Sequence, residues 1–292
     1  MTKVGVIGPG AMGCLFAARL AKSGAKVYLV DYRQDRAERL EKGGITVDTA
    51  DGTLTERPAV TGHVPTGLDL IIVLTKAYST AALRFPPETP VLTLQNGLGN
   101  VETLCSVLGS ARVLVGATSE AATLLREGHV RHAAPGVTSL GAWTSCPTGL
   151  AAEILEKADF DVNVTNAPGQ LIWEKVAINA GINPLSAILN VPNGQLLELT
   201  EIRQLMRDLV VEAAKVASTE GYRFEHSLVE IAEQVCRDTA DNISSMLQDT
   251  RAGRQTEIDA ISGEILRRAQ VASLPTPRTR VVYQLVRGLE SR

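Results

Sequence analysis

A glycine-rich turn near the start of the chain restricts the fold more than any other feature. The stretch "VGVIGPGAMGCLFAARLAKSGAKVYLVD" places Gly8, Gly10 and Gly13 in G-x-G-x-x-G spacing, between an apolar strand and an amphipathic helix that should end near Gly24. The first glycine allows a tight turn, the second lets a pyrophosphate approach the backbone, and the third lets helix and strand pack closely. Asp31 follows about 20 residues later, as in a dinucleotide-binding unit. The alternative is a tight turn that binds no ligand.

Short β-rich runs alternate with helical patterns as far as about residue 166. Most of these runs are apolar throughout, which is typical of strands covered on both faces. They are "KVGVI", "KVYLV", "LDLIIVLT", "PVLTL", "RVLVGAT" and "DVNVT". This order predicts an α/β fold with a doubly wound, Rossmann-type sheet. Two further segments, residues 44–56 and 128–143, look like antiparallel hairpins added to it.

The composition changes around "TNAPGQ", residues 165–170, and only helical periodicity follows. We therefore predict two domains. Residues 1–166 should form the dinucleotide-binding Rossmann domain, and residues 167–292 an all-helical substrate and catalytic domain.

The bulk composition excludes several classes of protein. A net charge of −3 with 45% hydrophobic residues indicates an ordinary globular protein that does not coat nucleic acid. No apolar run reaches the roughly 18 to 20 residues that would span a bilayer. The cysteines and histidines lack the spacing of a metal site. We expect a cytoplasmic protein with no metal and no membrane partner, and a homodimer is left open.

Polar residues follow several strands of the predicted sheet. Ligands of such sheets bind beyond the carboxyl ends of the strands. After the glycine turn and Asp31, these ends carry Lys76, Asn96 and residues 119–122. Singly, Lys76 could be a solvated strand end and Asn96 part of a common Asn-Gly turn. As a set they favour a cofactor cleft.

The residues around position 31 give two conflicting signals about the cofactor. Asp31 would accept hydrogen bonds from the adenosine ribose hydroxyls, which favours NAD and repels a 2′-phosphate. Arg33, two residues later, could instead attract that phosphate. We count both among the candidate cofactor-binding residues.

The stretch "WEKVAINAGINP" places Lys175, Asn179 and Asn183 four residues apart. At this spacing the three polar groups project from nearly one side of a helix, which is either a wet surface or the lining of a polar cleft. Pro184 should end or kink the helix. Asn193 follows in a turn, and Ser245 and Glu257 share a later helical stretch; each could also be a cap or an exposed helix residue.

The motifs "WEKVAINAGINPLSAILNVPNGQL" and "NISSMLQDTRAGRQTEID", after "GPGAMG", "TKAYS" and "LQNGLG", resemble the ketopantoate reductase (2-dehydropantoate 2-reductase) family over nearly the whole chain. The resemblance implies NAD(P)H-dependent reduction of the 2-oxo acid ketopantoate to pantoate, a step of pantothenate biosynthesis. It implies that Lys175 is the catalytic acid. The substrate contacts that it implies are Lys175, Asn179, Asn183, Asn193 and Ser245. The cofactor contacts that it implies are Gly8, Pro9, Gly10, Ala11, Met12, Gly13, Lys76, Asn96, Ala122 and Glu257.

The chemistry of a 2-oxo acid reduction agrees with these roles. A lysine ammonium can stabilise the developing alkoxide and protonate it, and Glu257, counted with Lys175 as catalytic, could keep that ammonium protonated. The helix of Lys175 would then be one wall of an active-site cleft. The resemblance favours NADP(H), but members that use NADPH commonly have an arginine where this chain has Asp31, so NAD(H) stays open. The rival functions are another β-hydroxyacid-type or 2-oxo acid dehydrogenase and a non-catalytic dinucleotide sensor.

Overall fold

The computed structural model describes residues 1–291 and divides the chain into two compact units. Unit 1 comprises Met1–Gln95 and Asn100–Pro168, and unit 2 comprises Asn96–Gly99 and the chain from Gly169 onward. The division after Pro168 lies close to the boundary that we predicted at residue 166. The assignment of the short loop Asn96–Gly99 to unit 2 was not predicted.

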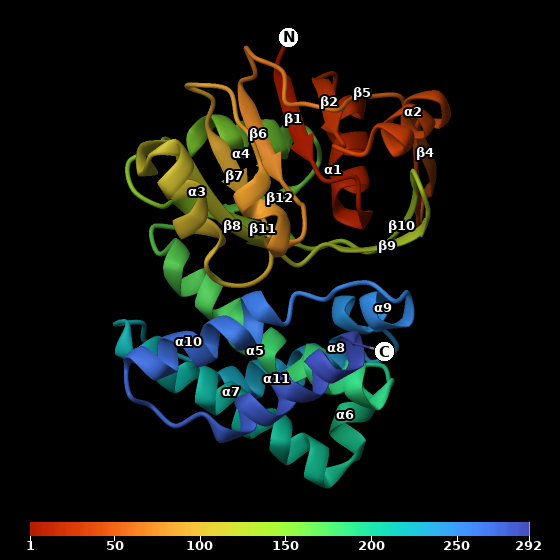
Figure 1. Ribbon diagram of the computed structural model, residues 1–292. Helices are drawn as coiled ribbons and strands as arrows, with labels where there is room; N and C mark the ends of the chain where they lie inside the picture. Colours follow the sequence, from red (N-terminus) through yellow and green to blue (C-terminus); the bar gives the residue numbers. More distant parts are fainter. Residues whose placement is uncertain (292) are drawn as a thin grey trace. The chain divides into compact units, whose positions relative to one another are not determined.

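Unit 1 is built on an eight-stranded sheet with the order β12-β11-β8-β7-β6-β1-β2-β5 (Figure 1). Its neighbouring strands are parallel, except that β11 runs antiparallel to β8. The predicted Rossmann-type sheet is confirmed. β6 and β8 are buried along their whole length, which explains their apolar sequences. The strands are β1 (Lys3–Ile7), β2 (Lys26–Val30), β5 (Ala59–Thr61), β6 (Leu70–Val73), β7 (Val91–Thr93), β8 (Val113–Thr118), β11 (Val137–Ala142) and β12 (Asp161–Val164).

Helix α1 lies at the centre of unit 1. Most of its residues are buried, and it contacts β1 and β2 of the large sheet as well as strands of a second, smaller sheet. Its apolar side chains therefore pack in a single hydrophobic core together with residues from both sheets. The helices of this unit are α1 (Ala11–Lys22), α2 (Gln34–Gly43), α3 (Asn100–Leu108) and α4 (Gly149–Lys157), with short 3-10 helices at η1 (Ala77–Ala82) and η2 (Ser110–Arg112).

The smaller sheet has the order β4-β3-β10-β9, formed by β3 (Ile45–Thr49), β4 (Gly52–Glu56), β9 (Ala121–Arg126) and β10 (His129–Ala134). The hairpin predicted at 44–56 is confirmed as β3 and β4. The hairpin predicted at 128–143 is wrong, because β10 pairs with β9 and β3 whereas β11 belongs to the large sheet. Gly136 lies at this crossing, where an added Cβ would come within 2.4 Å of the Ser119 carbonyl carbon.

Unit 2 is helical in the part of the chain described. It contains α5 (Pro168–Leu189), α6 (Gln195–Glu198), α7 (Thr200–Thr219), α8 (Leu228–Asp238), α9 (Ser245–Arg251), the π-helical segment η3 (Asp259–Gly263), α10 (Glu264–Val271) and α11 (Pro277–Glu290). Figure 1 shows α5 as a long helix among the others. Of the two predicted effects of Pro184, an end of the helix is contradicted, since α5 continues for five more residues. Burial of Leu185 and Ala187, which follow Pro184, supports this last part of α5.

Neither a membrane-spanning helix nor a cluster of metal-ligating side chains is found in residues 1–291. None of their helices combines the length and the apolar character that a membrane crossing needs. No group of three or more histidine, cysteine, aspartate or glutamate side chains among them is arranged to hold a metal ion.

Candidate active site

The three glycines of the turn after β1 differ in the space around them. Gly8 has φ of 104°, a left-handed conformation that favours glycine, and an added Cβ would come within 2.8 Å of Thr75. A Cβ at Gly13 would lie 1.8 Å from the Gly8 carbonyl oxygen, so only glycine allows α1 this close to the turn. A Cβ at Gly10 would meet nothing within 4 Å. The open position beside the N-terminus of α1 fits a pyrophosphate.

Asp31, which directly follows β2, is buried, and the Arg36 side chain covers it. Its carboxylate accepts hydrogen bonds from Nε of Arg36 and, at 2.8 Å, from Nη2 of Arg36. It also accepts one from the backbone N–H of Arg33 at 3.1 Å. The Arg33 guanidinium is exposed and lies 3.5 Å from Glu127. Sequence reasoning missed Arg36, although its position five residues after Asp31, in the first turn of α2, could have indicated the pair.

Gln95 connects the loops that follow β6 and β7. Its amide donates to the Thr75 carbonyl oxygen at 3.0 Å and to the Thr80 hydroxyl at 2.8 Å. These bonds hold the backbone on either side of Lys76, which precedes the turn η1. Gln95 was also missed, although it adjoins Asn96 in the motif "LQNGLG".

The loop Asn96–Gly99 brings Asn96 to Glu257. Gly97 has φ of 90°, and a Cβ there would lie 2.6 Å from the Ala260 side chain. Leu98 N–H donates to the Ala260 carbonyl oxygen at 2.8 Å, so the loop is fixed to η3. The Asn96 amide then lies 3.4 Å from Glu257 Oε2. Glu257 is buried and lies two residues before this π-helical segment, a distortion often found at functional sites.

Lys175 and Glu257 interact electrostatically within unit 2. Burial lowers the pKa of Lys175 from 10.5 to about 8, because the ammonium loses water, and the negative charge of Glu257 partly opposes this shift. A lysine with a pKa near neutrality can exist in both protonation states under ordinary conditions. Such a group can serve as a general acid and, in the reverse direction, as a general base.

A pair of serines joins α5 to α9 near Asn183. The Ser186 hydroxyl donates to the Asn183 carbonyl oxygen at 3.0 Å and lies 2.6 Å from the Ser244 hydroxyl. Ser244 is buried and caps α9 by accepting from Leu247 N–H at 3.1 Å. Ser245, the first residue of α9, is thereby placed close to the part of α5 that carries Asn183. Asn183 is itself buried, whereas Ser245 is exposed.

Two other predicted substrate contacts differ in their surroundings. Asn179 is partly buried on α5, one turn from Lys175. Asn193 is buried, and its amide donates to the Thr239 hydroxyl at 2.9 Å. Within residues 1–291 its Oδ1 has no hydrogen-bond partner, although it is inaccessible to solvent. Asn193 thus connects the α5–α6 turn with the end of α8.

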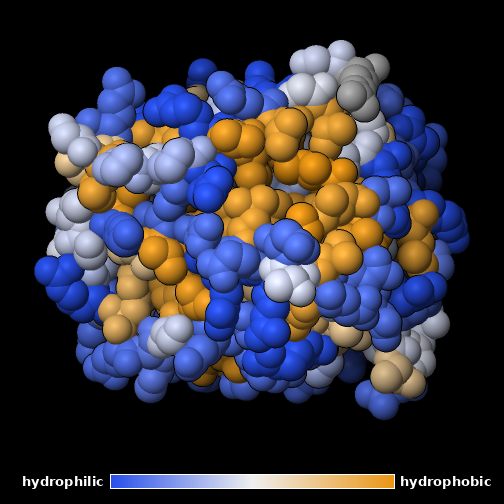
Figure 2. Space-filling model, turned by 90° about the horizontal axis from the view of Figure 1, so that it is seen from below, coloured by the Kyte–Doolittle hydropathy of each residue, from blue (hydrophilic) through white to orange (hydrophobic). Residues whose placement is uncertain are grey.

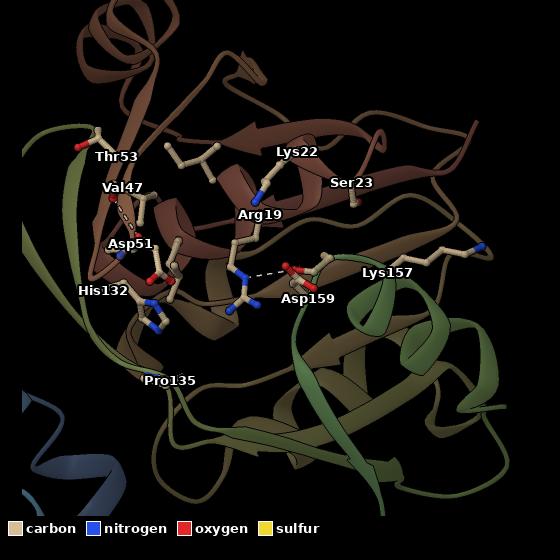
Figure 3. Close-up of a pocket in the computed structure, with 15 residues that line it drawn as sticks. Arg19, Lys22, Ser23, Val47, Asp51, Thr53, His132, Pro135, Lys157 and Asp159 are labelled. Atoms are coloured by element: carbon tan, nitrogen blue, oxygen red, sulfur yellow. Dashed lines mark hydrogen bonds between the residues drawn. The ribbon is translucent and has the colours of Figure 1, made fainter.

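Ala122 is not brought together with the glycine turn by any contact described. It lies in β9, opposite His132 of β10, and packs against the core of unit 1. A cavity of about 620 Å³ is lined by the end of α1 and by residues of β3 and β4 (Figure 3). Its Arg19 and His132 side chains both contact the buried Glu120. On α1 its lining begins at Leu15 and includes none of the three glycines of the turn.

The comparison with known families covers almost the whole chain. Residues 4–145 match the family described as ketopantoate reductase PanE/ApbA, and residues 169–290 match its C-terminal part. The chain belongs to the ketopantoate reductase family. A 2-dehydropantoate 2-reductase of Halobacterium salinarum is 35% identical over 98% of both chains. That of Pyrococcus horikoshii is 32% identical over 99% of this chain and 98% of the relative.

Solved structures of related proteins have the same fold. A ketopantoate reductase of Ralstonia eutropha superimposes with a TM-score of 0.90 at 28% identity, covering 99% of each chain. A D-mandelate dehydrogenase, solved with NADH and anilino(oxo)acetate, superimposes with a TM-score of 0.92 at 25% identity and the same coverage. This second protein, which shares the fold, binds NADH.

Proposed function

We propose that this protein reduces ketopantoate to pantoate with a nicotinamide cofactor. The observation that carries the proposal is the electrostatic interaction between Lys175 and the buried Glu257, in which the pKa of Lys175 is lowered to about 8. This pair lies in a chain that belongs to the ketopantoate reductase family. Relatives of 32% to 35% identity along their full length bear the name 2-dehydropantoate 2-reductase.

The residues around the glycine turn fit a dinucleotide. The open space at Gly10 and the N-terminus of α1 would hold its phosphates. The cofactor, when bound, supplies the hydride for the ketone carbon. Lys175 stabilises the negative charge that develops on the ketone oxygen and donates the proton that this oxygen needs. Glu257 favours the charged form of Lys175 and so keeps the proton available.

The substrate contacts are uncharged donors and acceptors. Asn179, Asn183 and Ser245 can hold hydroxyl and carboxylate groups without disturbing the charge of Lys175. We assign these side chains to the substrate. Asn193 is engaged with Thr239 through its amide nitrogen and its Oδ1 is inaccessible to solvent, so we assign it the role of fixing the turn after α5 rather than a direct contact with the substrate.

Steady-state rates with a panel of 2-oxo acids test the function. Ketopantoate, 2-oxoisovalerate and phenylglyoxylate should each be tried with NADPH and with NADH, and we expect the highest kcat/KM with ketopantoate. A preference for phenylglyoxylate would instead favour a D-mandelate dehydrogenase activity, as the structural likeness to such an enzyme suggests. Cofactor binding without turnover of any 2-oxo acid would indicate a dinucleotide sensor.

The cofactor that we propose is NADP(H). Arg33 and Arg36 both lie where the chain leaves β2, and the buried Asp31 carboxylate between them is already engaged. Guanidinium groups bind phosphates well because their donors match the spacing of phosphate oxygens. We expect kcat/KM to be higher with NADPH than with NADH.

We also propose a homodimer formed through α7 and α11. Figure 2 shows apolar side chains gathered on one face of the molecule. The exposed large apolar side chains on these two neighbouring helices are Val211, Val281 and Leu285. Apolar patches of this kind commonly mark protein interfaces. Light scattering of the wild-type protein should give twice the mass of one chain. The Leu285→Glu variant should have the mass of one chain, and the control variant Val107→Glu, on α3, should remain a dimer.

A further inference from the structure

Asp31 does not offer its carboxylate to solvent. The side chain is only 3% exposed, whereas that of Arg36, which covers it, is 27% exposed. A ribose that approached the end of β2 would therefore meet the guanidinium before the carboxylate. An acidic residue at this position usually contacts the ribose, because its carboxylate oxygens are free to accept hydrogen bonds from the ribose hydroxyls. In this chain that condition is not met.

The acceptor positions of the carboxylate are largely used within unit 1. An ionised carboxylate offers about four lone-pair sites. Two accept from Arg36 and one from the Arg33 N–H. A pair of ribose hydroxyls could reach Asp31 only if Arg36 moved away, which would leave a buried carboxylate without its charged partner. Such a loss is unfavourable because an unpaired buried charge is strongly destabilising.

Arg36 keeps donors for a ligand. A guanidinium has five N–H donors, and Asp31 takes two of them. Among residues 1–291, Nη1 of Arg36 has no hydrogen-bond partner. Glu127 also acts electrostatically on Arg36, but its carboxylate is bonded to Arg39 at 2.8 Å and lies 3.5 Å from Arg33. Arg36 is thus fixed by one carboxylate and still presents three N–H groups.

We propose that Arg36 is the residue that selects the cofactor by binding its 2′-phosphate, and that Asp31 is a positioning residue that holds Arg36 and is closed to ribose hydroxyls. The proposal rests on the cofactor binding proposed above for the glycine turn. On this proposal Asp31 favours NADPH, whereas an acidic residue at this position ordinarily favours NADH. The Arg33 side chain, which is 59% exposed and lies 3.5 Å from Glu127, would add to the attraction without fixing the geometry of the phosphate.

Dissociation constants of NADPH and NADH, measured by calorimetry on the full-length protein, test this assignment without any turnover. Arg36→Ala should weaken NADPH roughly 10- to 100-fold, the range for a lost charge-assisted hydrogen bond, and should leave NADH equal or tighter because Asp31 becomes accessible. Arg36→Lys keeps the charge but loses the bidentate hydrogen bond, so its dissociation constant for NADPH should lie between those of the wild type and Arg36→Ala. Asp31→Asn should raise the dissociation constant of NADPH several-fold and leave that of NADH unchanged. Arg39→Ala, on the same helix and paired with Asp35 and Glu127, is the matched control and should change neither.

Two results would overturn the proposal. The first is a tenfold loss of NADH affinity in Asp31→Asn, since it would show that the carboxylate does contact the ribose. The second is unchanged NADPH affinity in both Arg36 variants. A wild-type protein that binds in the expected pattern but reduces no 2-oxo acid would support the role of Arg36 and reject the proposed reaction, so the two failures are distinguishable.

Discussion

Lys175 is the residue on which the proposed chemistry depends most directly. Its side chain would supply both the positive charge and the proton for the ketone oxygen. We expect Lys175→Ala to lower kcat by roughly 100-fold or more, because a positioned acid and an oxyanion donor each contribute on this order. The dissociation constant of NADPH should barely change. Lys215→Ala, an exposed lysine on α7, should keep normal kcat, and a folded Lys175→Ala enzyme with near-normal kcat would remove this lysine from the mechanism.

The pKa of Lys175 predicts opposite pH profiles for the two directions of the reaction. The group is protonated below about pH 8 and neutral above it. Reduction needs the ammonium, so its kcat/KM should be highest below pH 8 and fall as pH rises through that value. Oxidation of pantoate needs the free amine, so its kcat/KM should rise through the same range.

Glu257 provides the control for this assignment. Its negative charge raises the pKa of Lys175, so Glu257→Gln should move both profiles to lower pH. A change in rate without a shift of the profile would mean that Glu257 does not act through Lys175. A shift to higher pH would contradict the electrostatic argument.

Spacing alone could predict residues on one helix but not pairs between elements. Lys175, Asn179 and Asn183 were predicted to share a face of one helix because helical periodicity fixes that geometry. The bond between Ser186 and Ser244 and that between Arg36 and Asp31 depend on how two elements pack or on a local turn. Neither has a periodic signature in the sequence.

At the scale of elements, the N-terminus of α9 is the structure that places Ser245. We expect Ser244→Ala to lower the free energy of unfolding by about 1 kcal/mol or more, because the variant loses the helix cap and the buried bond with Ser186. The KM for ketopantoate should rise as well, since α9 would no longer be fixed to α5. Urea denaturation and steady-state kinetics measure the two effects. Ser227→Ala removes an exposed cap of α8 and should reduce stability without raising KM.

The elements that could be predicted are those with a local cause. The glycine turn, the apolar strands and the β3–β4 hairpin each follow from residues close in the sequence. The failed hairpin at 128–143 had a suitable pattern, but β10 and β11 find their partners in different sheets. A strand pattern specifies which side chains are apolar and not which strand lies beside it. Likewise, the packing of α5 in the core outweighs the preference against helix at Pro184.

For the whole molecule, the proposed assignments place cofactor contacts in both units and substrate contacts in unit 2. Hydrogen exchange followed by mass spectrometry can therefore map each ligand separately. NADPH at 100 times its dissociation constant stabilises the folded state by about 2.7 kcal/mol, so exchange that requires global unfolding should slow by roughly 100-fold. Local protection should appear in residues 8–13, in residues 31–36 and in the loop Asn96–Gly99. Pantoate alone should protect α5 and the start of α9 but leave residues 31–36 unchanged. Protection of residues 31–36 by pantoate, or no effect of NADPH on the loop Asn96–Gly99, would contradict the division of roles, because Asn96 is assigned to the cofactor through its place beside Glu257.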